Sequence, residues 1–127
     1  MSLTKLIEAV EAGTARPGKY GHPDVMFMEV WLPTVSGPQL WQYASEAYDG
    51  SLDAAKRLHD ALLPGWVVRL TAGTDQSSFP YVHVFKPRKT EDDPAMGANS
   101  SGYRGYDPAR AWLLAILRAL EEEGRDG

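Results

Sequence analysis

Residues 48–71 read YDGSLDAAKRLHDALLPGWVVRLT and predict a helix, a stop and a strand in one short unit. Ser51 stands where a side-chain oxygen can accept a backbone N–H at the start of the helix. Pro64 cannot continue the helix, and Gly65 gives the chain the freedom to turn. The alternation in residues 66–71 then predicts a strand with one buried face. The stripe that the helix should bury consists of Leu52, Ala55, Leu58, His59 and Leu62.

The strand predicted at residues 66–71 has a neighbour further along the chain. A polar turn, AGTDQSS at residues 72–78, joins it to residues 79–86, FPYVHVFK. In this second segment the residues Tyr81, His83 and Phe85 alternate with Val82 and Val84. Two alternating segments joined by a short polar turn predict an antiparallel hairpin.

Helices are also predicted near both ends of the sequence. The first runs from about Leu3 to Ala12, because its apolar residues recur at helical spacing. The second begins at Asp107 with Pro108 in its first turn, which is a typical helix start. Its final turn is expected to fray, since residues 121–123 are all glutamate at the negative end of the helix dipole. The broad apolar face of this helix consists of Trp112, Leu113, Ile116, Leu117 and Leu120.

Two segments before the central unit are harder to assign. Residues 24–32, DVMFMEVWL, place apolar side chains on both faces whether they form a helix or a strand. Asp24 follows Pro23 and could serve as an N-cap, which favours the helix. Residues 39–47, QLWQYASEA, predict a weak strand on the basis of Leu40, Trp41 and Tyr43.

These elements together predict one α+β domain over residues 1–127. Its small antiparallel sheet of three or four strands packs with helices, and its ordered core comprises about residues 2–86 and 107–122. Residues 87–106, PRKTEDDPAMGANSSGYRGY, are predicted to be a long loop, and their Gly, Ser, Asp and Pro content favours disorder.

Composition limits the class of protein further. The hydrophobic share of 43% and the charged share of 24% are typical of a globular domain in water. The absence of cysteine excludes disulfides and thiolate metal sites. No secretory segment or membrane-length apolar run is present, so we expect a cytoplasmic protein with no membrane partner. The net charge of −4 argues against a broad nucleic-acid surface, although a local basic patch is compatible with it.

Several of these motifs resemble the bacteriophage alpha-beta-alpha sandwich domain family of short phage and prophage proteins. The matching residues are Tyr48, SLDAA at residues 51–55, LPGW at residues 63–66 and PARAWLLAILRAL at residues 108–120. The resemblance spans about residues 23–120. The chain departs from the family pattern in two places: no spacer separates Pro64 from Gly65, and Pro23-Asp24-Val25 replaces the Leu-Asp start that the family has there. The resemblance implies a sandwich of helices and a sheet, a phage or prophage origin and a helix at residues 24–32. It implies no activity and supplies no catalytic residues.

One stretch has the residue types of a binding site. Basic and aromatic residues flank the long predicted loop between Lys86 and Tyr106, and such residues can hold phosphates and stack bases. Acidic residues at positions 91–93 dilute this positive charge, so a solvated loop is the favoured interpretation and a nucleic-acid partner is the less favoured one. The candidate binding residues are Arg88, Lys89, Tyr103, Arg104 and Tyr106.

No pattern points to catalysis, a metal or a cofactor. The three histidines, His22, His59 and His83, occur in no metal-ligand motif and are interpreted as structural. No nucleophile elbow or phosphate-binding glycine motif occurs, and the adjacent carboxylates are interpreted as solvated.

Three functional hypotheses follow in order of preference. The first is a phage or prophage accessory protein that acts by binding a protein partner or by self-association. The second is a nucleic-acid-associated protein that uses the loop between Lys86 and Tyr106. The third is a small hydrolase, which no motif in the sequence supports.

Overall fold

Helix α5, Pro108–Glu122, lies at the centre of the protein. The computed structural model describes residues 3–12, 40–71, 80–88, 90–92, 97–105 and 107–122. As predicted, the helix start lies at Asp107 and Pro108, and the structure shows that Asp107 caps the helix: its Oδ1 accepts backbone N–H groups from Ala109 at 2.9 Å and from Arg110 at 3.3 Å. A helix that is apolar on nearly every side must be enclosed by other elements. The buried residues of α5 are Ala109, Ala111, Trp112, Leu113, Leu114, Ala115, Ile116, Leu117, Ala119 and Leu120.

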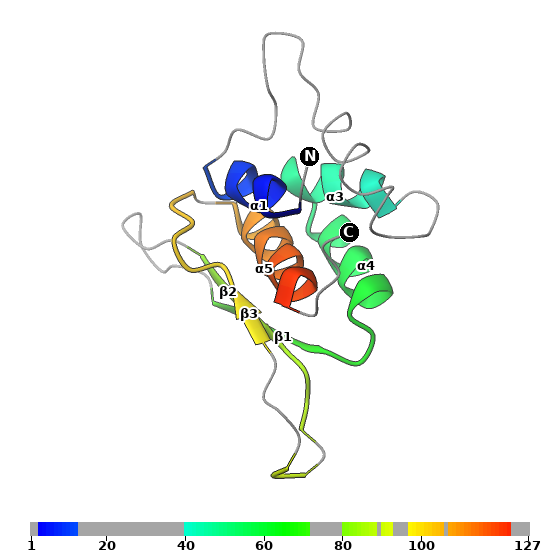
Figure 1. Ribbon diagram of the computed structural model, residues 1–127. Coiled ribbons are helices and arrows are strands. Elements are labelled where there is room, and N and C mark those ends of the chain that lie inside the picture. Colours follow the sequence, from blue (N-terminus) through cyan, green and yellow to red (C-terminus); the bar gives the residue numbers. More distant parts are fainter. Residues whose placement is uncertain are drawn as a thin grey trace, which may run out of the picture.

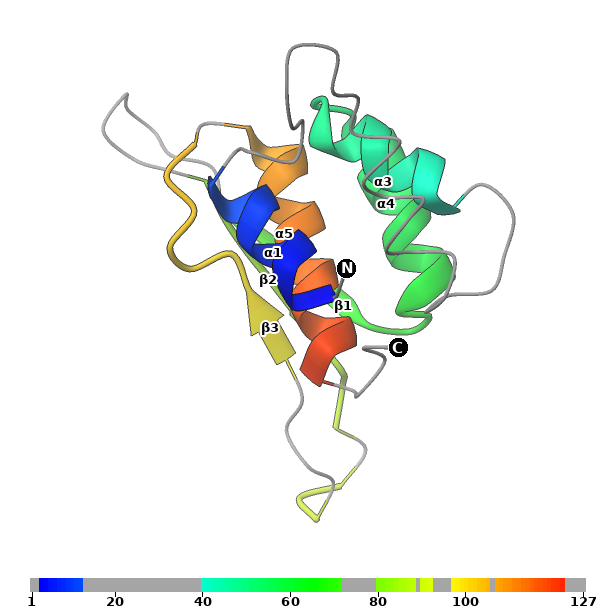
Figure 2. The same ribbon diagram turned by 45° about the horizontal axis from the view of Figure 1, so that its top comes forward.

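The other elements surround α5 on two sides (Figures 1 and 2). The three-stranded sheet covers one side through contacts of its strands β2 and β3 with α5. The other side contacts three helices, α1 (Leu3–Ala12), α3 (Leu40–Tyr48) and α4 (Leu52–Leu62). The fold class is therefore α+β, as predicted, with four helices and one small antiparallel sheet in the described part of the chain.

The sheet has the strand order β1-β2-β3 and is antiparallel throughout. The predicted hairpin is confirmed: β1 (Val67–Thr71) pairs with β2 (Tyr81–Phe85) in a register that sets Val68 opposite Val84. The third strand, β3 (Gly97–Asn99), pairs with the other side of β2 and sets Ala98 opposite Val84. Val82, Val84 and Ala98 are buried in the core cluster, so this face of the sheet is the one that packs on the helices.

The buried face predicted for residues 66–71 forms only in part. Trp66 and Val68 are half-buried and pack against the core, whereas Leu70 remains 41% exposed although it is paired with the buried Val82. The helices reach β2 and β3 but extend little beyond them, since no described helix makes an extensive contact with β1. Strand β1 is therefore an edge strand that the described helices cover only slightly.

The strand predicted at residues 39–47 is wrong, because residues 40–47 lie in α3. The buried residues Ala44, Ala47 and Tyr48 of this helix recur at helical spacing. Trp41 and Tyr43 have a high β-propensity, which favoured the prediction of a strand. The conformation is instead decided by the packing of a stripe of small residues on α4 and α5. The other ambiguous segment, residues 24–32, lies outside the described residues.

The prediction of a continuous loop across residues 87–106 is also wrong over Gly97–Asn99, which form β3. Hydrogen bonds continue the pairing past the end of this strand. Val82 N donates to Ser100 Oγ at 2.9 Å, and Ser100 N donates to Val82 O at 3.0 Å. The buried Ser100 thus supplies a partner for the backbone of the central strand, which a composition-based argument cannot detect.

The central unit follows its prediction closely. Ser51 caps α4 by accepting the Ala54 N–H at 3.1 Å, and Gly65 turns the chain at a φ of 82° before β1 begins. The predicted stripe is buried except for Leu52, which is 42% exposed in the first turn of the helix.

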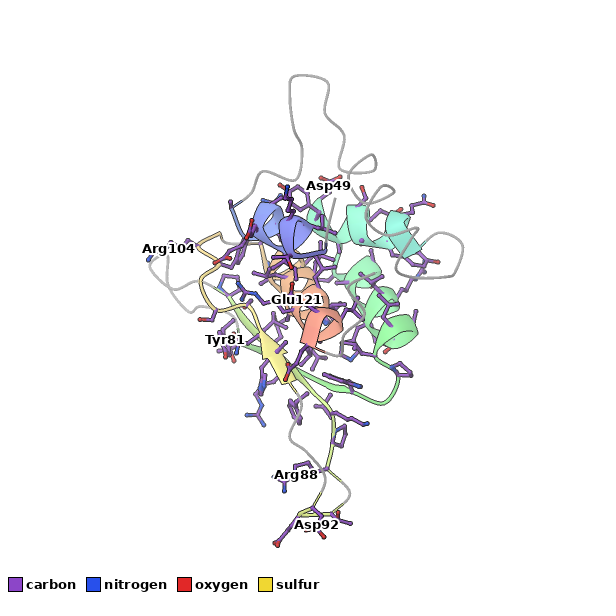
Figure 3. All side chains as sticks on the ribbon, viewed as in Figure 1. Asp49, Tyr81, Arg88, Asp92, Arg104 and Glu121 are labelled. Atoms are coloured by element: carbon purple, nitrogen blue, oxygen red, sulfur yellow. The ribbon has the colours of Figure 1, made fainter. Side chains whose placement is uncertain are left out.

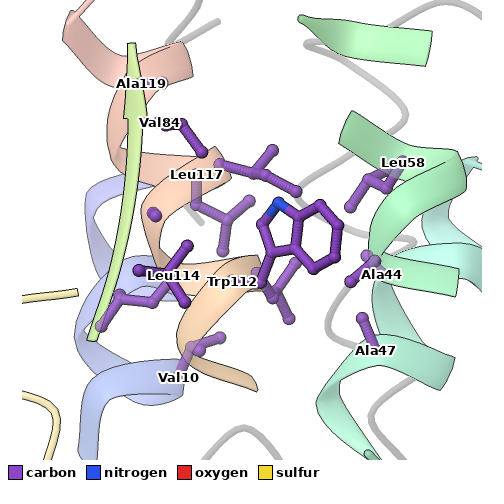
Figure 4. Packing of buried hydrophobic residues seen from close by; sticks show 14 of the residues in the cluster. Val10, Ala44, Ala47, Leu58, Val84, Trp112, Leu114, Leu117 and Ala119 are labelled. Carbon is purple, nitrogen blue, oxygen red and sulfur yellow. The ribbon is translucent and has the colours of Figure 1, made fainter. Parts of the chain in front are cut away.

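Two side chains fasten α4 and α3 to α5. Trp112 reaches from α5 toward Ala44, Ala47 and Leu58 (Figure 4), and its indole N–H donates to His59 Nδ1 at 3.3 Å. Arg110 donates from Nε and Nη2 to the carbonyl oxygen of Tyr48, at 3.0 and 2.9 Å. A cation that binds the last carbonyls of a helix also interacts favourably with its dipole, so Arg110 stabilises the end of α3.

Replacing Ser51 with Ala removes the acceptor for the Ala54 N–H. We expect the free energy of unfolding to fall by about 1 kcal/mol, which urea denaturation would measure. Ser51→Asp should retain most of the stability, because an aspartate can cap the same helix. Equal loss in both variants would contradict the capping role.

Candidate functional site

The face of the sheet that points away from the helices carries aromatic and basic side chains. The strand register arranges them in rows across the sheet. One row places His83 between Arg69 on β1 and Asn99 on β3, and the next places Phe85 between Val67 and Gly97. Because side chains alternate along a strand, Tyr81 lies on the same face as His83 and Phe85. We call this the outer face, defined by Arg69, Tyr81, His83, Phe85 and Asn99.

A hollow of about 470 Å³ opens at one end of the outer face. Gly97 helps to form it, since a Cβ atom there would lie 3.1 Å from His83 Nε2 and 3.3 Å from Phe85 Cβ. A glycine opposite an aromatic ring leaves one side of that ring uncovered. The hollow is lined by His83, Phe85, Lys86, Pro87, Arg88, Gly97, Asn99 and Glu122.

The charges around the hollow are mainly positive. Lys86 and Arg88 line it where the chain leaves β2, and the guanidinium carbon of Arg69 lies 5.8 Å from the centre of the Phe85 ring. Glu122, at the end of α5, is the acidic residue in the lining. Arg88 also donates to the backbone carbonyl of Glu91, which fixes its position near the hollow.

The two aromatic rings at the hollow contact each other. The ring centroids of His83 and Phe85 are 5.1 Å apart, with an angle of 34° between their planes. Both side chains are half-buried, and Tyr81 is 42% exposed. The central strand thus presents three partly accessible rings on one side.

The structure does not bring the predicted binding residues together. Arg88 is exposed and lines the hollow, whereas Arg104 is exposed beside α1, where it lines a separate shallow depression with Glu8 and Glu11. Figure 3 shows Arg88 and Arg104 in different parts of the molecule. Tyr103 is only 6% exposed and belongs to the core cluster, so its ring is not available for stacking. Lys89 and Tyr106 lie outside the described residues.

The residues that the outer face brings together are not grouped in the sequence. Arg69, Phe85, Gly97 and Asn99 come from three strands, and only the register makes them neighbours. The alternation of Tyr81, His83 and Phe85 with valines does indicate this face in the sequence. The valines between these residues are expected on the core side of the strand, so the three rings lie on the other side.

His59 is a structural residue, as predicted. It is 3% exposed, accepts the Trp112 indole N–H at Nδ1 and lies 3.0 Å from the Trp66 carbonyl oxygen through Nε2. An indole N–H can only donate and a carbonyl can only accept, so Nδ1 is the acceptor and Nε2 the donor in these two hydrogen bonds. Among the described residues, no group of three or more His, Asp or Glu side chains could hold a metal ion.

The buried side chain of Tyr103 lies beside the start of α5. Desolvation raises the pKa of Tyr103 above its usual value near 10, and the nearby backbone of Asp107 and the charge of Arg110 act in the opposite direction. Its hydroxyl accepts the Asp107 N–H at 3.4 Å. Tyr103 therefore supports the start of α5.

Comparison with protein-family models, with curated proteins and with solved structures gives no match for this chain. None of the helices within the described ranges is long and apolar enough to cross a bilayer.

His59→Phe should lower the free energy of unfolding by about 1–3 kcal/mol, because it leaves the Trp66 carbonyl and the Trp112 indole N–H without a partner in the core. Urea denaturation of His59→Phe, Trp112→Phe and the double variant would test this. The two losses should be clearly non-additive, since each substitution breaks the same hydrogen bond. Additive losses would contradict the bond.

The raised pKa of Tyr103 predicts a loss of stability in alkali. As the pH rises through 10, the unfolded chain releases the phenolic proton first, so the contribution that is complete below pH 10 is lost above it. Tyr103→Phe should have a shallower fall in stability over this range, measured as urea midpoints against pH. A fall in stability that is as steep in Tyr103→Phe as in the wild type would contradict this role of the Tyr103 phenol.

Proposed function

We propose that the protein is an accessory protein of phage or prophage origin that acts in the cytoplasm by binding, through addition of a partner strand to the free edge of its sheet. The origin is supported by the sequence motifs at residues 51–55 and 63–66. The binding mode is supported by one observation, the exposed apolar edge of β1.

Strand β1 is the last strand on its side of the sheet in the described part of the chain. An edge strand presents unpaired N–H and C=O groups that can pair with another chain. Val67 and Leu70 are each 41% exposed, and they lie on opposite faces of the strand. An added strand would therefore cover apolar surface on both faces as well as pair the backbone, which is how strand addition gains affinity and specificity.

A second copy of the chain is the simplest partner. Two β1 strands that pair in antiparallel fashion around a twofold axis would join the two sheets into one continuous sheet. A register centred on Leu70 is favourable because it sets Arg69 opposite Thr71 of the other copy. A register centred on Arg69 would instead place two like charges opposite each other, which is destabilising.

The hydrolase hypothesis receives no support from the described residues. Tyr103, whose pKa is raised by burial, lies in the core rather than in the hollow. A general acid or base would need a displaced pKa at an accessible position.

The test is the oligomeric state of the full chain as a function of concentration, measured by sedimentation equilibrium. We expect reversible dimers of the wild type, and monomers of Leu70→Lys, because a charge on the edge opposes strand pairing. Leu52→Lys is a matched control: Leu52 is the same residue type at nearly the same exposure, 42%, but lies on α4. It should dimerise like the wild type. A wild type that stays monomeric at the highest soluble concentration would overturn self-association through this edge.

A further inference from the structure

We propose that the outer face of the sheet binds single-stranded nucleic acid, with bases on the aromatic rings of β2 and phosphates on the basic residues around the hollow. The site differs from the β1 edge in both position and chemistry, because it uses side chains on the face of the sheet rather than backbone groups at its rim.

The aromatic column favours a ligand with planar groups. Tyr81, His83 and Phe85 follow one another at every second residue of the central strand, so their side chains share one face, and the His83 and Phe85 ring centroids lie 5.1 Å apart. Stacking of successive bases on such rings is the usual way in which proteins hold single strands without regard to sequence, and open sheet faces with exposed aromatics serve this purpose. A column of rings suits a chain of several bases better than one isolated nucleotide.

The basic residues are placed to contact a phosphate backbone that follows this column. Arg69 is paired directly with His83 on the neighbouring strand, and Lys86 and Arg88 continue beyond Phe85 at the end of β2. All three side chains are on exposed residues. Positive charge therefore accompanies the rings on one side and at one end.

The hollow has the size for one nucleotide unit at the end of the column. Its volume of about 470 Å³ falls within the range of small-molecule sites. Gly97 leaves the β3 side of Phe85 open, and the amide of Asn99, which lines the hollow, adds a polar group. The Asn99 side-chain oxygen accepts the Ser101 N–H at 2.9 Å, so its NH₂ group remains the donor for a base or phosphate.

Acidic groups set a limit on the affinity. Glu122 lines the hollow, Glu91 and Asp92 lie on the connection beyond Arg88, and the whole chain has a net charge of −4. These charges oppose a polyanion, so binding should be strongest at low salt and should improve when Glu122 loses its charge.

The experiment is fluorescence anisotropy of a labelled, mixed-sequence single-stranded oligonucleotide, as DNA and as RNA, titrated with the full-length protein at several salt concentrations. Tyr81→Ala should weaken binding about tenfold by removing one stacking ring. Tyr81→Phe should retain binding. Arg69→Ala and Arg88→Ala should each weaken binding and reduce the slope of log affinity against log salt by about 0.7, the value of one lost phosphate contact.

Two further variants distinguish binding at this site from nonspecific attraction between the oligonucleotide and positive charges elsewhere on the protein. Glu122→Gln should tighten binding, a gain that misfolding cannot produce. Arg57→Ala is the matched control, because it removes one exposed positive charge from α4, on which no residue lines the hollow, and it should leave the affinity unchanged. Thermal unfolding of each variant would establish that it folds.

The proposal is overturned by the absence of binding at low salt, by equal binding of duplex DNA together with no effect of Tyr81→Ala, or by equal binding of a labelled poly-glutamate peptide. It is also overturned if Arg104→Ala abolishes binding while Arg69→Ala and Arg88→Ala do not, since the ligand would then lie beside α1. None of these outcomes bears on dimerisation through β1, which Leu70→Lys tests separately.

Discussion

The enclosure of α5 is the constraint on which the rest of the structure depends. Ten of its fifteen residues are buried, so the helix needs apolar surface on nearly every side. The sheet supplies one side, and α1, α3 and α4 supply the others. None of these elements is long enough to be stable alone, since short helices and isolated hairpins are marginal in water. Each is held in place by its contact with α5. Because one face of the sheet packs on α5, the aromatic and basic side chains lie on the opposite, outer face.

Polar groups on α5 then fix how its neighbours are aligned. Arg110 holds the last carbonyl of α3 near the beginning of α5. Arg118, two turns further on, donates to the carbonyl oxygens of Asn99 and Ser101 and forms an ion pair with Glu11 at 3.1 Å. One arginine therefore aligns the helical side, and the other joins β3 to α1. Arginine suits both places because its planar group can serve several acceptors at once.

The sequence predicts the elements that have strong local signals. Prediction fails for the elements whose conformation depends on contacts with distant parts of the chain. The α4 cap at Ser51, the α5 start at Asp107 and the β1–β2 hairpin follow from capping chemistry and alternation. Helix α3 was mistaken for a strand because its buried stripe is mainly alanine, which carries little hydrophobic signal. Strand β3 was missed because its three residues are defined by pairing with β2. Of the candidate site, Arg88 was predicted, whereas Arg69 and Gly97 required the register.

The position of α5 in the chain has a consequence for folding during synthesis. It follows every other described element, so α1, α3, α4 and the β1–β2 hairpin leave the ribosome before the helix that covers their apolar faces. Until α5 emerges, the described elements lack the helix against which their apolar faces pack. We expect the nascent chain to remain an incomplete, loosely packed intermediate until α5 emerges, and to fold cooperatively only then. During that interval the chain depends on rapid emergence of α5, or on a chaperone, to escape aggregation.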